Sequence, residues 1–196
     1  MMKSQFRTAI VAFGIAVSAA VSPVIAAPTA QINGGYTLVE LLPGFVGALT
    51  TLGIAPSKAL PGTLYQRIGY FPIVGGRLDA SNARGEVPHS GGLTLTKGAT
   101  QVILTDFVID TAGGAPKLTG IVTANGSIVG RIPLFNLSLQ PLTLPLTLPT
   151  GPEILLIEGS RMTPTQEAAT ALNGVFGTTA FVAGFDIGIA SIYGNY

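Results

Sequence analysis

The chain contains one histidine, His89, in the stretch GEVPHSGGLTL. Imidazole titrates near neutral pH and binds metals readily, so a histidine can serve as a ligand or as a general base. Zinc sites, however, use three or four His, Cys or carboxylate ligands, and this chain has no cysteine. We therefore expect no metal site. We expect the His89 ring to bond a backbone carbonyl group at the entrance of a strand.

The residues around His89 do not indicate acyl-transfer chemistry. Ser90 is adjacent to His89, and neighbouring side chains of an extended segment point to opposite sides, so the two cannot form a nucleophile–base pair. Gly159-Ser160-Arg161 lacks the second glycine of a nucleophile elbow. Asp106 and Asp110 would lie about 13 Å apart on one strand face, which is too far for a glycosidase pair. The sequence therefore predicts no enzyme, with hydrolysis as the last alternative.

The first 26 residues have the pattern of a secretory signal peptide. Lys3 and Arg7 form a basic start, an apolar run extends from Ala9 to Val21, and Val24-Ile25-Ala26 supplies small residues at the exit. We expect residues 27–196 to form one domain that is secreted, periplasmic or at the cell surface. No later segment has the ~20 uninterrupted apolar residues of a membrane span, so no transmembrane segment is expected after the signal is removed.

The composition excludes several classes of partner and bond. Without Lys3 and Arg7, eight of the ten basic residues remain against nine acidic ones, so nothing attracts nucleic acid. The absence of cysteine excludes disulfides and thiolate ligands. Only 10% of the residues are charged, and a surface with so little charge favours self-association.

The first half of the domain shows one helix among extended segments. A proline near its start and a glycine after its end place a short helix at Pro43–Leu52. Alternating residues predict a strand at Gly35–Leu42 before it. The prolines of Ile54–Pro61 indicate a loop, and Leu64–Ile73 has the pattern of a single strand.

The middle of the chain predicts two hairpins. Leu93–Thr96 and Gln101–Thr111 alternate and meet at Lys97-Gly98, so we expect them to pair. In the second of these strands, the face that carries Ile103 and Phe107 is expected to lie in the core. Asn125-Gly126 is typical of a type I′ turn and predicts that Leu118–Ala124 pairs with Ser127–Phe135, with Pro133 at an edge or bulge.

The last third of the chain completes the sheet. The recurring prolines of Leu134–Leu148 predict an extended edge strand or a covering loop. Glu153–Met162 should be a strand, and the capping-box pattern Thr163-Pro164-Thr165-Gln166 predicts a helix through Leu172. Ala180–Tyr193 returns as a closing strand. These elements predict an all-β or β-dominated α+β fold, either an antiparallel β-sandwich or a partly closed barrel, with two short helices.

The chain also resembles known exported proteins. Six stretches resemble, in order and spacing, a family of secreted bacterial proteins of unassigned function: LPGFVGALTTLGI, FPIVGGRLD, GEVPHSGGLTL, VILTDFVID, GRIPLFNLSL and ALNGVFGTTAF. GEVPHSGGLTL is also similar to part of the HtaA haem-uptake domains, which are exported β-rich modules that hold haem with a tyrosine helped by a histidine. This resemblance implies that His89 matches the motif and that Tyr36 lies in the region of the tyrosine.

Three functions remain open from the sequence. The leading hypothesis is a non-catalytic envelope domain without a cofactor, which acts in surface assembly or attachment with itself or with other envelope proteins. The alternative is binding of haem or another apolar small ligand, with His89 and Tyr36 as the cofactor-binding residues. Hydrolysis is the third. The resemblance names no ligand, so it does not decide between the first two.

Overall fold

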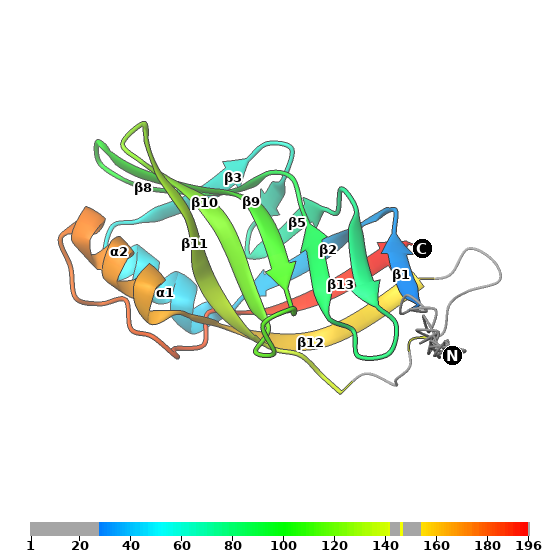
Figure 1. The fold of residues 1–196 in the computed structure, drawn as a ribbon. Helices are drawn as coiled ribbons and strands as arrows, with labels where there is room; N and C mark the ends of the chain where they lie inside the picture. Colours follow the sequence, from blue (N-terminus) through cyan, green and yellow to red (C-terminus); the bar gives the residue numbers. More distant parts are fainter. Residues whose placement is uncertain (1–27, 142–145, 147–153, 196) are drawn as a thin grey trace, which may run out of the picture.

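The computed structural model describes residues 28–141, 146 and 154–195. The predicted signal peptide, residues 1–26, lies outside the described residues, as does most of the proline-rich stretch after residue 141. The described residues form thirteen strands and two helices (Figure 1). Their bounds are β1 Thr29–Ile32, β2 Gly34–Leu41, α1 Pro43–Thr51, β3 Ala55–Ala59, β4 Thr63–Tyr65, β5 Ile68–Pro72, β6 Gly76–Asp79, β7 Gly85–Pro88, β8 Gly92–Lys97, β9 Thr100–Asp110, β10 Lys117–Ala124, β11 Ser127–Ser138, β12 Ile154–Pro164, α2 Gln166–Phe176 and β13 Gly188–Asn195.

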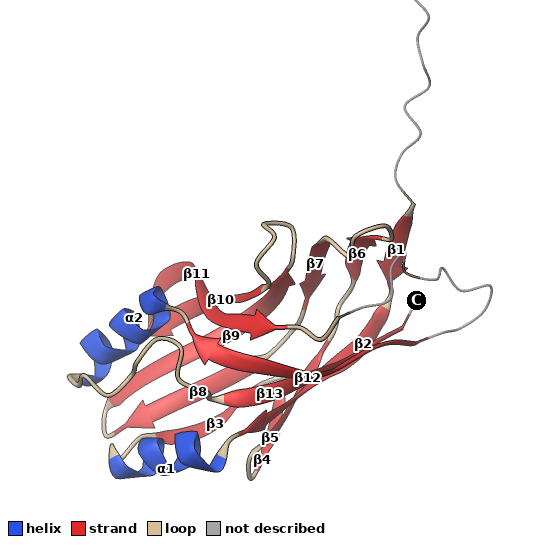
Figure 2. Ribbon diagram, turned by 90° about the horizontal axis from the view of Figure 1, so that it is seen from below, coloured by secondary structure: helices blue, strands red, loops and turns tan. Residues whose placement is uncertain are grey.

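All of these strands belong to one antiparallel sheet. Its order is β1-β6-β7-β9-β10-β11-β12-β13-β2-β5-β4, and β8 pairs with both β9 and β3. The sheet curls strongly, and both helices lie at the same end of it (Figures 1 and 2). Buried apolar side chains from the inner face of the sheet and from both helices form one core. The predicted β-dominated fold with two short helices is therefore confirmed.

The curled sheet meets itself at His89. Ile73, just after β5, forms an isolated antiparallel bridge with His89, just after β7. The backbone N–H of Val74 donates to the carbonyl oxygen of Pro88 at 3.0 Å, and that of Ser90 donates to Pro72 at 2.9 Å. These bonds join β5 to β7, which otherwise stand far apart in the strand order. The architecture is therefore the partly closed barrel, not the sandwich.

Strand β9 pairs as predicted but buries a different set of residues. Asp106 has a φ of 50°, and the register with β10 shifts opposite it, between Thr119 and Ile121. This irregularity switches the buried face, because two residues on one side of it take the room of one. Val102 and Leu104 are buried before it, and Phe107 and Ile109 after it. The prediction that Ile103 faces the core is therefore wrong, whereas Phe107 is correctly placed.

The predicted hairpin and helices are confirmed, with one shift of a helix start. Asn125 and Gly126 have φ angles of 50° and 83°, and Ala124 pairs with Ser127 across this turn. Helix α1 begins at Pro43 as expected. Helix α2 instead has Thr165 as its N-cap, whose hydroxyl oxygen accepts a hydrogen bond from the Ala168 N–H at 3.1 Å. Pro164 ends strand β12, so the predicted cap at Thr163 is two residues early.

Three predicted segments differ in detail. The expected loop at Ile54–Pro61 contains β3, which can hold Pro56 because it pairs on one side only, with β8. The expected single strand at Leu64–Ile73 is a hairpin, β4 and β5, that turns at Gln66 with a φ of 55°. The closing strand begins only at Gly188. Within the described ranges, neither helix combines the length and the apolar character that crossing a bilayer requires.

Candidate ligand-binding cavity

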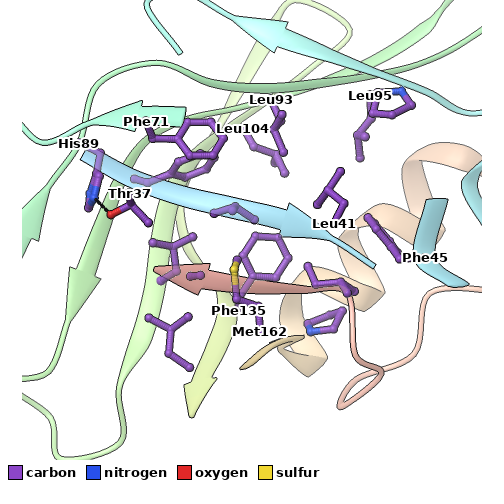
Figure 3. A pocket seen from close by; sticks show the side chains of 18 of the residues that line it. Thr37, Leu41, Phe45, Phe71, His89, Leu93, Leu95, Leu104, Phe135 and Met162 are labelled. Carbon is purple, nitrogen blue, oxygen red and sulfur yellow. Dashed lines mark hydrogen bonds between the residues drawn. The ribbon is translucent and has the colours of Figure 1, made fainter. Parts of the chain in front are cut away.

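An apolar cavity of about 60 Å³ lies inside the curled sheet. Strands β2, β5, β8, β9 and β11 contribute to its wall, and both helices close its far end. Thr37 and His89 are the polar side chains among the described residues that line it, and the other lining side chains are apolar. Figure 3 shows these two side chains at one end of the cavity, whereas Phe45 of α1 lies at the other. Their polar atoms are not exposed to the cavity, whose accessible surface is apolar throughout.

His89 is fixed at this end by two hydrogen bonds. Its ring Nε2 and the hydroxyl oxygen of Thr37 are 2.7 Å apart, and both residues are buried. Its backbone N–H donates to the carbonyl oxygen of Phe107 at 2.7 Å. The expectation that the ring bonds a backbone carbonyl at a strand entrance is therefore corrected, because its partner is a side-chain hydroxyl. Thr37 was not identified from the sequence, since 52 residues separate it from His89.

The second ring nitrogen of His89 has no hydrogen-bond partner. His89 is only 4% exposed, and Nδ1 is inaccessible and forms no regular hydrogen bond in the part of the chain that the structure describes. Burial lowers the pKa of His89 from 6.5 to about 4, while the nearby carbonyl groups of Phe107 and Val87 oppose this shift without forming a regular hydrogen bond. The ring is therefore neutral at pH 7, and one of its polar atoms is unsatisfied.

Glycines allow the backbone to crowd together beside His89. A Cβ atom on Gly92 would lie 1.8 Å from the carbonyl oxygen of Leu104, and one on Gly91 would lie 2.1 Å from the backbone nitrogen of Gly62. Neither contact is tolerable for a side-chain carbon. The Gly91-Gly92 doublet therefore has a geometric role, because it lets β8 approach β9 and the Ala59–Gly62 turn.

Tyr36 lies on the opposite face of the sheet from His89. It precedes Thr37 in β2, so its side chain points outward, where it is 41% exposed. Its ring stacks on that of Tyr193 at 4.9 Å between centroids and lies 5.9 Å from that of Tyr70. Desolvation and the nearby Glu158 carboxylate raise the pKa of Tyr193. The structure thus places the two predicted cofactor-binding residues apart, with Tyr36 in an outer tyrosine cluster formed by Tyr36, Tyr70 and Tyr193.

The remaining reactive side chains do not gather into a centre. Asp106 is exposed on the outside of β9, and the Asp110 carboxylate accepts a hydrogen bond from the Ala112 backbone N–H. No three His, Cys, Asp or Glu side chains lie together among residues 28–141 and 154–195. Ser160 is fully buried, and its hydroxyl has no partner among the described residues. It is absent from the wall of the central cavity.

A larger apolar slot lies beside the central cavity. Its volume is about 260 Å³, and it is bounded by α2 on one side and by β9, β10 and β11 on the other. Leu104, Phe135 and Leu172 line both spaces, so a single layer of side chains separates them. A third space of about 160 Å³ lies between α1 and the segment around Phe181. The apolar interior therefore continues from His89 to both helices.

Comparison with known proteins finds likeness in the fold. No family model matches the chain, and no curated protein does. Three solved structures from Corynebacterium glutamicum are similar. The C-terminal domain of HtaA has a TM-score of 0.60 at 13% identity, covering 83% of this chain and 98% of that domain. The N-terminal domain of HtaA has a TM-score of 0.56 at 15% identity, covering 82% of this chain and 98% of that domain. The heme binding protein HtaB has a TM-score of 0.52 at 11% identity, covering 86% of this chain and 98% of that protein.

At these identities the likeness is one of architecture. The matches extend over more than four fifths of the chain and nearly the whole of each solved domain, which is far more than a single hairpin. The resemblance to HtaA-type domains that the GEVPHSGGLTL stretch indicates is thereby confirmed for the fold. The chain has the fold of the HtaA and HtaB domains.

Proposed function

We propose that this chain is a non-catalytic binding protein for an apolar small molecule, which is held between α2 and the curled sheet. The carrying observation is the slot of about 260 Å³, which approaches the ~300 Å³ at which ligand pockets usually begin and whose accessible lining is almost wholly apolar. Apolar surface that a ligand covers there contributes about 25 cal/mol per Å².

The interior does not fit haem held by a tyrosine with a histidine beside it. No tyrosine lines the cavity within the described part of the chain, and the residue that meets His89 is Thr37, whose aliphatic hydroxyl is not a usual haem ligand. A cavity of about 60 Å³ is also far smaller than the ~300 Å³ at which ligand pockets usually begin. The central cavity therefore does not fit a porphyrin.

Binding of the uncharged fluorophore N-phenyl-1-naphthylamine tests the proposal. We expect saturable fluorescence enhancement at one site per chain, and at least fivefold weaker binding in Ala171→Phe, whose ring would occupy the slot. Ala112→Phe is the matched control, because Ala112 is exposed and lies outside the slot. Unchanged affinity in a folded Ala171→Phe variant would contradict the proposal.

The native protein gives an independent readout, which avoids the variant. Saturating fluorophore should shift the methyl resonance of Ala171, because this side chain lines the slot. If the fluorophore binds while this resonance stays unshifted, the ligand lies elsewhere and the proposed site is wrong.

Haem binding is a second candidate, at a different place. The outer tyrosine cluster offers exposed phenol groups, and phenolate is a known haem ligand. The fold neighbour HtaB, a heme binding protein, supports this candidate. Haemin should then give a Soret band that weakens in Tyr36→Phe but not in Tyr65→Phe, because Tyr65 is highly exposed and is not among the rings stacked in the cluster. An identical spectrum in all three proteins would eliminate this candidate.

Surface assembly or attachment, the leading hypothesis from the sequence, stays a prediction. Exposed Ile128 and Val129 on β11 and exposed Leu156 on β12 are apolar side chains available to a partner. Mass by light scattering should then rise with concentration. A constant monomer mass at millimolar protein concentration would count against self-assembly.

A further inference from the structure

The outer tyrosine cluster is built on three adjacent strands of the sheet, β13, β2 and β5. Tyr193 pairs directly with Tyr36, and Leu38, two residues after Tyr36 in β2, pairs with Tyr70. The plane of the Tyr36 ring makes an angle of 24° with that of Tyr193 and of 55° with that of Tyr70. Tyr36 and Tyr70 are both about two fifths exposed. The cluster therefore presents aromatic surface to solvent, on rings that hold one another in place.

A bulge in β12 brings a carboxylate to this cluster. The register of β12 with β13 shifts between Ile157 and Ser160, and Gly159 has a φ of 68° there. Bulges commonly re-aim a neighbouring side chain. Desolvation is the main cause that raises the pKa of Tyr193, and the charge and the acceptor oxygen of Glu158 raise it further. The Glu158 carboxylate therefore lies beside the phenol group of Tyr193.

This carboxylate has no cation to neutralise it. Arg67, in the turn before β5, is paired with Glu40 at 3.2 Å. Arg161, which follows the bulge in β12, is paired with Asp186. Among residues 28–141 and 154–195, Glu158 itself forms no ion pair. One uncompensated negative charge is thus left next to three aromatic rings.

We propose that the outer tyrosine cluster and Glu158 bind the quaternary ammonium group of a small soluble molecule. A cation over the face of a tyrosine ring is attracted by the ring quadrupole, and aromatic side chains recognise quaternary ammonium ligands in this way. A primary ammonium group is strongly hydrated, so half-exposed rings compete poorly with water for it. This inference does not depend on the slot beside α2, and it gives the cluster a ligand other than haem.

Three probes separate the effect of the charge from that of the methyl groups. Choline, its uncharged isostere 3,3-dimethyl-1-butanol, and ethanolamine are each titrated at pH 7 and constant ionic strength, while the tyrosine ring resonances are followed. We expect choline to bind at least about fivefold more tightly than either of the others, because the isostere lacks the charge and ethanolamine lacks the methyl groups. Equal or tighter binding of the isostere or of ethanolamine would overturn the proposed ligand class.

The place of binding is tested in the native protein and in one variant. Choline should shift the ring resonances of Tyr36 and Tyr193 and leave those of Tyr65 unchanged, since Tyr65 is exposed but is not among the stacked rings. Tyr36→Leu should weaken choline at least about fivefold, whereas Tyr65→Leu, the matched control, should not. Unshifted Tyr36 resonances, or unchanged affinity in a folded Tyr36→Leu variant, would refute the site.

Glu158→Gln tests the carboxylate, because it removes the charge at nearly constant shape. It should weaken choline about threefold, as expected for an exposed charge pair, and leave the uncharged isostere unaffected. Glu86→Gln is the matched control, because Glu86 is exposed on β7, whose pairing strands are β6 and β9. Equal losses in the two variants would show that the net charge of the protein acts and Glu158 does not, which would overturn its role.

Two last measurements define what the site is independent of and where its ligand comes from. Ala171→Phe, which fills the slot, should bind choline as the native protein does, so the slot and the cluster can fail separately. Loss of choline binding in that variant would contradict a separate site. Phosphatidylcholine vesicles present the same group on a membrane, and we expect no sedimentation of the protein with them. Sedimentation that choline reverses would assign the site to a lipid surface and overturn the small soluble ligand.

Discussion

Acidification should weaken the fold through His89. An unfolded chain binds a proton on this histidine near pH 6.5, whereas in the folded chain burial lowers the pKa to about 4. Between these values the unfolded state holds more protons, so the free energy of unfolding falls as the pH falls from 6.5 towards 4. The part of the free energy of unfolding that depends on a neutral His89 is fully present above pH 6.5 and has been lost below pH 4.

The size of this effect follows from the two pKa values. At about 1.4 kcal/mol per unit, the whole difference corresponds to about 3 kcal/mol, of which about 2 kcal/mol is lost between pH 7 and pH 5. Asp79 does not interfere in this window. A hydrogen bond from the Ser81 hydroxyl is the main cause that lowers the pKa of Asp79 further below 3.8, so its carboxylate stays charged in both states. The loss between pH 7 and pH 5 is therefore specific to His89.

Urea unfolding at pH 7 and pH 5 measures the effect. The native protein should lose about 2 kcal/mol, and His89→Gln, which cannot titrate, should lose almost nothing. Equal losses in the two proteins would refute the assignment. Should His89→Gln not fold, the ring Hε1 resonance of the native protein decides, because it should stay unshifted from pH 7 to pH 5. A titration midpoint near 6.5 in the folded protein would show that the ring is not desolvated.

Three further changes test the geometry by urea unfolding. Thr37→Val should lower the free energy of unfolding by about 1–3 kcal/mol, because it leaves Nε2 of His89 without a partner. An unchanged free energy of unfolding would mean that the hydrogen bond to Thr37 contributes nothing. Gly92→Ala should lower the free energy of unfolding by more than about 2 kcal/mol, since its methyl group would collide with the carbonyl oxygen of Leu104. Gly113→Ala is the control, because a Cβ atom there has open space and should have little effect. Equal effects of the two substitutions would disprove the crowding at Gly92. Thr165→Ala should cost about 1–2 kcal/mol and Thr163→Ala little, and the reverse order would restore the cap predicted from the sequence.

Local patterns predicted the parts of the fold that local forces decide. The Asn125-Gly126 turn was correct because both residues tolerate the left-handed backbone that its geometry demands. The start of α1 at Pro43 was correct because proline is preorganised for the first turn of a helix. Both signals act over a few residues, so the rest of the fold does not override them.

Prediction failed where distant pairing decides. The buried face of β9 depends on an irregularity at Asp106, a residue type that takes a positive φ only when its surroundings require it. Segment 54–61 became a strand because β8 lies beside it, although its own prolines indicate a loop. In both cases the sequence pattern was weaker than the contact with a neighbouring strand.

The candidate site was half predictable. His89 stood out because it is the one histidine in the sequence. Thr37 carried no such signal, since a threonine in an alternating strand is common. Its contact with His89 exists only after the curled sheet has closed. The slot beside α2 could not be predicted either, because its sheet wall and its helix wall come from segments more than 30 residues apart in the chain.

The junction between β5 and β7 also determines where the curled sheet can open locally. Neighbouring strands elsewhere in the ring are held by ladders, whereas here a single bridge and two flanking amide bonds complete the circuit. Opening this junction breaks few hydrogen bonds and leaves both helices intact, yet it admits water directly to the imidazole of His89. The amide hydrogens of Val74 and Ser90 should therefore exchange with deuterium well before those of β9 and β10. A bound ligand that contacts both β5 and β7 would slow this exchange.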